Sequence, residues 1–599
     1  SKMKKLLFFT KLIFLIILTG YAQAYELTIL HMNDHHSHLS ADTSMDLKLA
    51  GKMTRVRSGG FPAVVQKFKT LESQNRNVIK LHAGDAITGD LYFTLFEGEA
   101  DAALMNEVCF DALAIGNHEF DFGDTGLAKF LDFLNDGECK TTFLAANVIP
   151  ELGASALAKK SVNDYLLPYV ILERGGVEIG IIGIDIVSKT TISSSPDSTT
   201  KFLDEKKTAQ KYVKELQDKG VKHIILLTHY QYKNDLELAK SLDGVDVIVG
   251  GDSHSLLGNF SELGLNSVGP YPTISSDKSG QPVCIVQAWQ FSQIVGELIV
   301  QFDELGNVKE CSGTPHMMLA DSFKRKNSEG DRVELAGDVR KDVMLAVEEN
   351  PLLSVVSEDP EAAAKLATFT EAVSEKKAIK VAVVAENLCF ERIPGQGRSK
   401  LCDVSVTSVM GSDISNLVAH AFRDMAKASQ IAIQNGGGVR IDIGKGDLSI
   451  GDAYQLLPFA NTLVELDMSG AEIHEVLEDA LDLALKPDGS SGAYPYAAGL
   501  RWDVDAKKQK GMRILNLEFK GPKDNEWVPI SKTRMFKVVT NNYIASGKDG
   551  YLTFGKVSKE GRVVDTYLDY AQSFVDYARK VGTLKKLPAS EYSTQSFQK

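Results

Sequence analysis

Two short polar loops are the first candidates for chemistry in this sequence. Each follows an apolar run typical of a buried strand: VIKLHA leads into Gly84-Asp85, and DALAIG leads into Asn117-His118-Glu119. Asp85 could offer one carboxylate oxygen to each of two cations, Asn117 a neutral carbonyl oxygen, and His118 a base or acid near neutral pH. Either loop alone could be an ordinary turn with polar caps. Because both follow apolar runs in neighbouring parts of the chain, we interpret them as parts of one metal site.

Three further apolar runs end in similar residue types: YELTILHMND, VKHIILLTHY and VDVIVGGDSHS. Together the five strand ends predict the ligands Asp34, His36, Asp85, Asn117, His229, Asp252 and His254. This set of oxygen and nitrogen atoms without sulfur suits zinc, manganese, cobalt or iron(II). It is too large for one tetrahedral ion and about right for two ions that share a carboxylate. Paired metal ions are a recurring device for hydrolysing phosphate esters.

The elements that must position these residues alternate between strand and helix through the first ~300 residues, which predicts a layered α/β domain with buried strands. From about Cys311 to Cys389 this rhythm is lost, and NSEGDRVELAGD is charged and glycine-containing. The stretch EDPEAAAKLATFTEAVSEKKAIK reads as one helix, with Asp359 and Pro360 suited to its start. We interpret this helix as the connector between two domains.

The second domain begins near Ala378 with the strand IKVAVVAE and the helix SDISNLVAHAFRDMA. The strand QIAIQN then meets Gly436-Gly437-Gly438, whose bare backbone allows close approach to a ligand. We predict that DTYLDYAQSFVDYARKV is a closing helix. The predicted divisions are a signal peptide at 1–24, the first domain at 25–345, the linker helix at 346–377 and the second domain at 378–599.

Composition narrows the functional classes. The chain has 599 residues and a formal charge of −13, which argues against binding to nucleic acid or to anionic lipid. A basic start, the apolar stretch LLFFTKLIFLIIL and Ala22-Gln23-Ala24 together predict a secretory signal peptide and an exported protein without a membrane span. Six cysteines fit an oxidising compartment, and short loops close most readily. We therefore predict the disulfides Cys109–Cys139, Cys284–Cys311 and Cys389–Cys402.

The motifs NDHHSH, AGD, GNHEFDFG, THY and GGDSH resemble those of the calcineurin-like metallophosphoesterases in order and spacing. The motifs QNGGGVR, LPFANT and TNNYIASGKDGY resemble the nucleoside-binding segments of the 5′-nucleotidase family. Within that family the chain looks most like the periplasmic NAD nucleotidases. The resemblance implies a four-layer α/β–β/α metallophosphoesterase domain, a linker helix and a C-terminal α/β nucleotide-binding domain.

The resemblance also implies residue roles. One metal would be held by Asp34, His36, Asp85 and His254, and the other by Asp85, Asn117, His229 and Asp252. Asp252 and His254 depart from the family pattern, in which many relatives have His, any residue, then Gln or Asn. His118 and Asp121 look like the catalytic dyad, although Asp121 could instead be a helix cap. The residues implied in substrate binding are Asn435, Gly437, Arg440, Phe459, Tyr543 and Asp549, with Arg392 and Arg398 on a loop longer than in relatives.

These roles predict a monomeric periplasmic hydrolase with two divalent metal ions, zinc foremost, or manganese or cobalt. Its small-molecule partners would be NAD, NMN and AMP. It would cut the pyrophosphate of NAD to NMN and AMP and would remove phosphate from 5′-nucleotides. Alternatives are UDP-sugar hydrolase or 2′,3′-cyclic nucleotide phosphodiesterase activity, and a non-catalytic nucleotide-binding surface protein.

Overall fold

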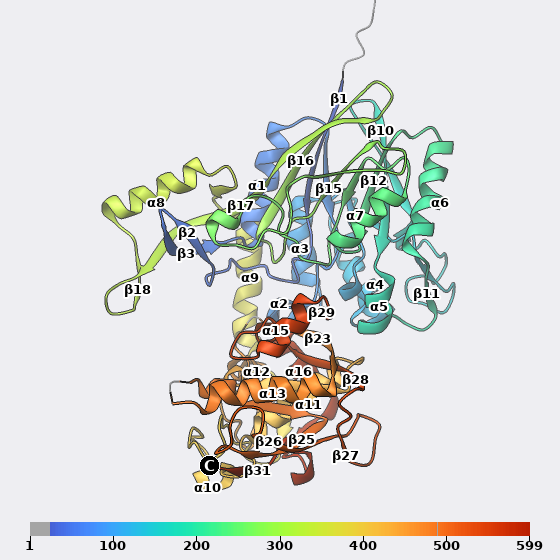
Figure 1. Ribbon diagram of the computed structural model, residues 1–599. Helices are drawn as coiled ribbons and strands as arrows, with labels where there is room; N and C mark the ends of the chain where they lie inside the picture. Colours follow the sequence, from blue (N-terminus) through green and yellow to red (C-terminus); the bar gives the residue numbers. More distant parts are fainter. Residues whose placement is uncertain (1–23, 460, 488) are drawn as a thin grey trace, which may run out of the picture.

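The computed structural model describes residues 24–459, 461–487 and 489–599, which form two α/β lobes (Figure 1). The predicted signal peptide lies outside the described residues, except for Ala24. None of the helices in the described ranges combines the length and the apolar character needed to cross a membrane.

Two facing sheets form the centre of the first lobe. The larger has eleven strands in the order β2-β3-β17-β16-β1-β4-β5-β6-β8, with β18 and β19 paired to β17, and the smaller has the order β14-β15-β13-β12-β10-β9. The strands of the larger sheet are β1 Tyr25–Met32, β2 Asp46–Leu49, β3 Lys52–Ser58, β4 Val78–His82, β5 Ala112–Ala114, β6 Thr142–Leu144, β8 Leu166–Leu167, β16 Ile294–Phe302, β17 Val308–Lys326, β18 Arg332–Glu334 and β19 Leu353–Val355. Those of the smaller sheet are β9 Tyr169–Arg174, β10 Val177–Asp185, β12 His223–His229, β13 Val247–Val249, β14 Thr273–Ser276 and β15 Pro282–Val286.

Apolar side chains hold these layers together. Leu27, Leu81 and Leu298 of the larger sheet share one buried cluster with Ile181 and Val249 of the smaller. Helices cover the two outer faces: α1 Phe61–Gln74, α3 Glu99–Val108 and α4 Gly123–Asn135 on the larger sheet, and α6 Glu205–Asp218 and α7 Tyr232–Ser241 on the smaller. The predicted four-layer α/β–β/α arrangement is confirmed.

Parallel pairing brings the functional strand ends together. β1, β4, β5 and β6 run parallel, as do β10, β12, β13 and β15. The carboxyl ends of parallel strands meet at one edge of a sheet, where loops can present side chains to a shared site.

The region before the connector is more regular than its sequence suggests. β17 is a continuous strand of 19 residues, and α8 Gly337–Glu349 follows it, so the predicted loss of rhythm was wrong. Charged and apolar residues are interspersed here because much of this region projects from the lobe, as Figure 1 shows for α8 and β18. Its strands and helix therefore lack the continuous apolar runs of the buried sheets.

The predicted connector helix is present as α9 Pro360–Lys376. Its cap is the Asp359 side chain, which accepts a hydrogen bond from the backbone N–H of Ala362. Its side chains Leu366 and Val373 join the buried cluster of the first lobe, where α9 packs against α1, α3 and α2 Leu91–Phe96. The end of this helix, rather than its start, is thus where the chain leaves the first lobe.

The second lobe is built on a five-stranded sheet of order β24-β21-β28-β23-β29, with a three-stranded sheet β22-β20-β30 and a four-stranded sheet β27-β26-β25-β31. The strands are β20 Lys380–Val384, β21 Ile431–Asn435, β22 Gly446–Ser449, β23 Thr462–Ser469, β24 Pro495–Ala498, β25 Leu500–Asp505, β26 Ile514–Phe519, β27 Val528–Pro529, β28 Met535–Asn541, β29 Val563–Asp569, β30 Thr583–Leu584 and β31 Thr594–Gln598. Helices α11 Asp413–Met425 and α16 Tyr570–Val581 cover one face of the central sheet, and α13 Gly470–Leu485 and α15 Leu552–Lys559 cover the other.

The closing helix differs from its prediction. DTYLD belongs to β29, and α16 begins only at Tyr570, after an Asp569 side chain that caps it by accepting the N–H of Gln572. Capping breaks the apparent helical run, because an N-cap residue has an extended backbone. The chain then continues through β30 to β31, so α16 does not end the fold.

All three predicted disulfides are present: Cys109–Cys139, Cys284–Cys311 and Cys389–Cys402. They use all six cysteines of the sequence.

Candidate dinuclear metal centre and nucleotide pocket

Five strands of the first lobe deliver the seven predicted metal ligands to one place. The ligands lie at or just after the ends of β1, β4, β5, β12 and β13, and none of them is more than 8% exposed. Five of them form two overlapping groups, Asp34-His36-His254 and Asp34-Asp85-His229, and within each group the ligating atoms lie within 4.8 Å of one another. Asp252 adjoins the second group, with Oδ1 3.4 Å from His229 Nε2. The structure therefore gathers these residues as two adjoining donor clusters.

Asp34 and Asp85 lie between the two clusters. Asp34 Oδ1 is 3.2 Å from His254 Nε2 and 3.8 Å from His229 Nε2. Asp85 Oδ2 is 2.9 Å from His229 Nε2 and 3.6 Å from His36 Nε2. Each carboxylate thus faces imidazoles of both clusters.

The chemistry of the buried atoms fits divalent cations. Four groups present polar atoms that are buried and lack a hydrogen-bond partner among the described residues: Asp34 Oδ1, Asp85 Oδ2, Asp252 Oδ2 and both amide atoms of Asn117. Leaving such atoms uncompensated costs several kcal/mol each. Cations held by the oxygen atoms of this set would remove that cost for those oxygens.

The imidazoles are oriented for metal binding. In each, Nδ1 donates to an oxygen: His36 to Thr88 O at 2.8 Å, His229 to Ala83 O at 2.7 Å, and His254 to Gln290 Oε1 at 2.9 Å. Donation from Nδ1 fixes the tautomer and leaves the Nε2 lone pair for a metal ion.

Backbone strain is concentrated in the same loops. Five of the predicted ligands have a backbone φ between 46° and 72°, a region that residues other than glycine seldom adopt. They are Asp34, His36, Asp85, Asp252 and His254. Gly116 is also required, because a Cβ atom there would lie 2.3 Å from Asp85 Oδ1. The fold supports an arrangement that local preference opposes.

Glu119 joins the loop that carries Asp85 to the loop that carries Asn117. Its buried carboxylate accepts backbone N–H groups of Asp85 at 2.9 Å, Ala86 at 2.7 Å and Gly116 at 2.6 Å. It thereby fixes the turn that carries Asp85 against the turn that carries Asn117. Sequence reasoning did not assign Glu119 a role, although it stands within the GNHE motif.

His118 and Asp121 form the predicted pair beside the clusters. His118 Nδ1 lies 2.6 Å from Asp121 Oδ2, and the two side chains are 1% and 7% exposed. Burial lowers the pKa of His118, but the charges of Asp121 and Asp85 outweigh burial and raise this pKa to about 9. The imidazole is thus held as a proton donor close to the metal ligands.

A segment of the second lobe covers this centre. His118 Nε2 donates to the backbone carbonyl of Thr566 at 2.6 Å, and the Tyr567 ring stacks on His254 with centroids 3.6 Å apart and planes at 3°. Both residues belong to β29, whose pairing with β23 shifts register between Thr462 and Val464. Sequence reasoning missed them because it placed DTYLD in a helix.

Lys189, on α5 Val187–Ser193, is a second missed residue. Its Nζ lies 2.7 Å from Asp252 Oδ1 and 4.7 Å from the centre of the Tyr567 ring, and it is 6% exposed. Burial lowers the pKa of Lys189, but the Asp252 carboxylate outweighs burial and raises it. Its place just beyond the carboxyl end of β10 is the signal that could have identified it.

Seven of the eight predicted substrate residues line one cavity of about 350 Å³ in the second lobe. They are Arg392, Asn435, Gly437, Arg440, Phe459, Tyr543 and Asp549. Phe459 and Tyr543 are 45% and 44% exposed, so each leaves part of its surface open to a ligand in the cavity. Asn435 Nδ2 donates to Asp549 Oδ2 at 2.9 Å. The cavity combines stacking surfaces with hydrogen-bonding groups.

Arg398 is the exception. It is exposed and does not line the cavity, although its charge acts on the neighbouring Arg392. Tyr543 lies on the short helix α14 Asn542–Ala545.

Comparisons with known proteins agree with both halves of this architecture. The calcineurin-like phosphoesterase family model matches residues 27–256, and the 5′-nucleotidase C-terminal domain model matches residues 381–556. A probable 5′-nucleotidase of Treponema pallidum is 38% identical over 565 residues, covering 93% of this chain and 92% of that protein. The NAD 5′-nucleotidase of Haemophilus influenzae is 38% identical over 564 residues, covering 93% and 91%.

A solved structure is similar throughout its length. The Haemophilus influenzae NAD nucleotidase has a TM-score of 0.88 and 37% identity, and the match covers 96% of this chain and 99% of that one. Both lobes, and not only the phosphoesterase lobe, are therefore shared with it.

Proposed function

Because the chain belongs to the 5′-nucleotidase family and is a nucleotide hydrolase, we propose that it cleaves NAD to NMN and AMP and removes phosphate from 5′-nucleotides. The observation that carries this proposal is the pairing of two sites. One lobe holds a donor set suited to divalent cations beside a proton-donating histidine, and the other holds a cavity with two exposed aromatic rings. Hydrolysis next to a held nucleoside requires both.

We assign one cation to Asp34, His36, Asp85 and His254, and the other to Asp85, Asn117, His229 and Asp252. Two divalent cations bound there, zinc being the first candidate, would acidify a water and offset charge on phosphoryl oxygens. The chain's own contribution is His118, whose Nε2 proton can hydrogen-bond a phosphoryl oxygen as charge develops on it. Asp121 keeps the His118 ring in orientation through Nδ1. Water adds to phosphorus, and the bond to the leaving oxygen breaks.

The cavity supplies the nucleoside half. We propose that the base stacks between Phe459 and Tyr543, and that Asn435 and Asp549 hydrogen-bond its edge and the ribose. Arg392 and Arg440 line the same cavity and give it a positive side suited to phosphates. A nucleotide with a pyrophosphate and one with a single phosphate share this recognition, so both are substrates.

The test is a time course of products from NAD with purified protein, with and without a chelator. AMP and NMN should appear before free phosphate, and the chelator should stop both reactions. Phosphate release from AMP with no cleavage of NAD would reject the NAD activity and leave a plain nucleotidase. UDP-glucose and 2′,3′-cyclic AMP belong in the same panel, since faster turnover of either would favour that alternative.

We also propose that the protein works in the periplasm as a monomer. Three disulfides that use all six cysteines support an oxidising compartment. Cell fractionation followed by thiol labelling tests this: the protein should be found in the periplasmic fraction with no reactive thiol.

A further inference from the structure

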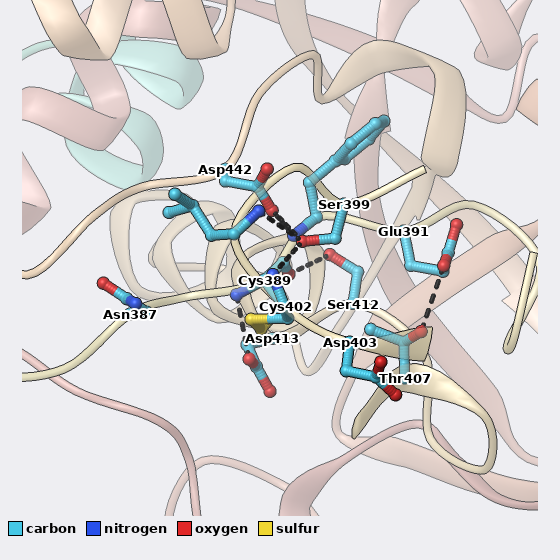
Figure 2. Close-up of a disulfide and its surroundings, with 12 residues drawn as sticks. Asn387, Cys389, Glu391, Ser399, Cys402, Asp403, Thr407, Ser412, Asp413 and Asp442 are labelled. Carbon is cyan, nitrogen blue, oxygen red and sulfur yellow. Dashed lines mark hydrogen bonds between the residues drawn. A yellow bond between two sulfur atoms is a disulfide. The ribbon is translucent and has the colours of Figure 1, made fainter. Parts of the chain in front are cut away.

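The loop between Cys389 and Cys402 carries two arginines, one of which, Arg392, lines the nucleotide cavity. Its ends are joined by the disulfide (Figure 2), and it lies between β20 and α10 Val404–Thr407. Arg392, near its start, lines the cavity, and Arg398 follows the turn at Pro394-Gly395. The disulfide alone fixes only the ends of this loop, so other contacts must shape its interior.

Glu391 is the centre of that interior. Its side chain is fully buried, and its carboxylate accepts the backbone N–H groups of Gly397 at 2.8 Å and Arg398 at 3.2 Å and the hydroxyl of Thr407 at 3.0 Å. The backbone N–H of Arg392 points to the same carboxylate at 3.1 Å. Figure 2 shows the bond to Thr407 as a dashed line. One carboxylate therefore sets the backbone of both arginines.

Every one of these donors is a neutral group. A carboxylate buried without a cation is costly unless hydrogen bonds replace its water, and here several converge on it. A loop that served only as a connection could avoid this cost with an apolar residue. The arrangement indicates that the exact course of the loop matters.

Asp442 ties the loop to the cavity wall. Its carboxylate accepts the N–H of Phe390 at 2.6 Å, the hydroxyl of Ser399 at 2.6 Å and the N–H of Lys400 at 2.8 Å. Asp442 follows Arg440 by two residues, so the loop and the third arginine of this region are joined through one side chain. Figure 2 places Asp442 and Ser399 together above the disulfide.

The Arg392 side chain has little to hold it within the protein. Among the described residues its buried Nε has no hydrogen-bond partner, and its Nη1 makes one contact of 3.4 Å, with the Ser491 hydroxyl. Burial lowers the pKa of Arg392, and the nearby charges of Arg398 and Arg440 lower it further. Arg392 and Arg440 line the cavity and Arg398 lies near them, and like charges this close together are unfavourable unless an anion joins them.

We propose that Glu391 is a positioning residue: it orients Arg392, which lines the cavity, and the exposed Arg398 beside it toward the phosphates of the ligand, and so controls affinity for nucleotides but not for nucleosides. This inference rests on the proposed function, because it takes the cavity to be the nucleotide site. Glu391 itself does not touch the ligand. Its effect passes through the backbone of the two arginines.

The test compares a phosphorylated with an unphosphorylated ligand. Glu391→Gln keeps the size of the side chain but removes the charge and puts an N–H₂ against N–H donors. We expect KM for AMP to rise about tenfold, the order expected for lost hydrogen bonds to a charged group. The inhibition constant of adenosine, which occupies the cavity without a phosphate, should change less than about twofold. Glu386→Gln, the same change at an exposed position nearby, should alter neither value.

Two further variants separate positioning from general damage. In an Arg392→Gln/Arg398→Gln background, Glu391→Gln should add no further loss, because the groups through which it acts are gone. If Glu391→Gln does not fold, Thr407→Val takes its place. This variant removes only the hydrogen bond from the Thr407 hydroxyl to the Glu391 carboxylate, and it should raise KM for AMP by a smaller factor.

Three results would each overturn the inference. The first is that Glu391→Gln weakens binding of AMP and adenosine by the same factor, and the second is that it leaves KM for AMP unchanged. The third is that it raises KM for AMP by its full factor in the Arg392→Gln/Arg398→Gln background. A wild-type protein that turns over no nucleotide would instead overturn the proposed function, so the two failures are distinguishable.

Discussion

His118 Nε2 lies 2.6 Å from the backbone carbonyl oxygen of Thr566, a residue 448 positions later in the sequence. With Nδ1 on Asp121, both ring nitrogens of His118 face oxygen acceptors. A carbonyl oxygen can only accept a hydrogen bond, so Nε2 must carry a proton. The carbonyl of Thr566 therefore takes the hydrogen bond that we assign to a phosphoryl oxygen of the substrate.

Replacing this histidine should slow the chemistry without emptying the metal site. We expect His118→Asn to keep both metal ions and to lower kcat by about 10²–10⁴, the usual contribution of a positioned acid or base. Asp121→Asn should cost less, because it only orients the ring. Metal content and kcat on AMP check this. A variant that loses metal would make His118 a ligand instead.

Asp85→Ala should remove metal and activity together. Asp85 faces imidazoles of both clusters, so its loss should lower metal occupancy at both positions. Turnover should fall by more than about a hundredfold, which is the largest effect usual for residues that only hydrogen-bond to a metal ligand. Elemental analysis of the purified variant gives the occupancy, with the exposed Asp136→Ala as control. Two bound ions and near-normal activity in Asp85→Ala would contradict the dinuclear assignment.

The metal ligands could be located from sequence because each stands directly after an apolar run. To predict that Asp34, Asp85 and His229 meet, it is enough to know that the carboxyl ends of parallel strands lie at one edge of a sheet. The start of α9 could be predicted for the same reason, because its signal is local: Asp359 is the N-cap and Pro360 is the first helical residue. Disulfide pairs were found because neighbouring cysteines in the chain are neighbours in space.

The residues that were missed depend on contacts between distant parts of the chain. Nothing near Tyr567 indicates that its ring stacks on His254, since these residues meet only when the two lobes pack. The position of Lys189 beyond the end of β10 is a local signal, but its pairing with Asp252, which follows a different strand, is not. The periodicity of the sequence also gave the wrong element for β29. Its apolar residues continue the helical pattern of α16, but this segment pairs with β23 and is a strand.

The Lys189–Asp252 pair predicts a stability difference that depends on metal. Lys189→Met leaves a buried carboxylate without its cation, so the free energy of unfolding in chelator should fall by about 3 kcal/mol. A divalent cation at Asp252 would supply the missing positive charge, so saturating metal should remove most of that deficit. Denaturant unfolding with and without metal checks this, with exposed Lys201→Met as control. An equal deficit in both conditions would show that Asp252 does not face a bound cation.

The aromatic pair should govern nucleotide affinity. Stacking on one ring is worth about 1–3 kcal/mol per base, so Phe459→Ala and Tyr543→Ala should each raise KM for AMP by about 5- to 150-fold. Tyr543→Phe keeps the ring face and should leave KM nearly unchanged. Steady-state kinetics with AMP test this, and inhibition by adenosine should weaken in parallel. Unchanged inhibition by adenosine would place the base elsewhere.

The last prediction concerns movement between the lobes. In this arrangement Thr566 and Tyr567 lie over His118 and His254, so a phosphoryl group can reach His118 only if the second lobe shifts. We expect it to turn about the end of α9, where the chain leaves the first lobe. Lys427 donates to Ser195 across the lobes at 2.7 Å, which marks a pair of positions for locking them.

Ser195→Cys/Lys427→Cys would carry the protein's only free thiols, because the native cysteines are all paired. Joining them with a short photocleavable bismaleimide should stop turnover of AMP, and light should restore it without reducing the native disulfides. Each single-cysteine variant treated in the same way controls for the reagent. Because the lock holds the carbonyl of Thr566 on His118, a cross-linked protein at full activity would show that the reaction proceeds without this shift.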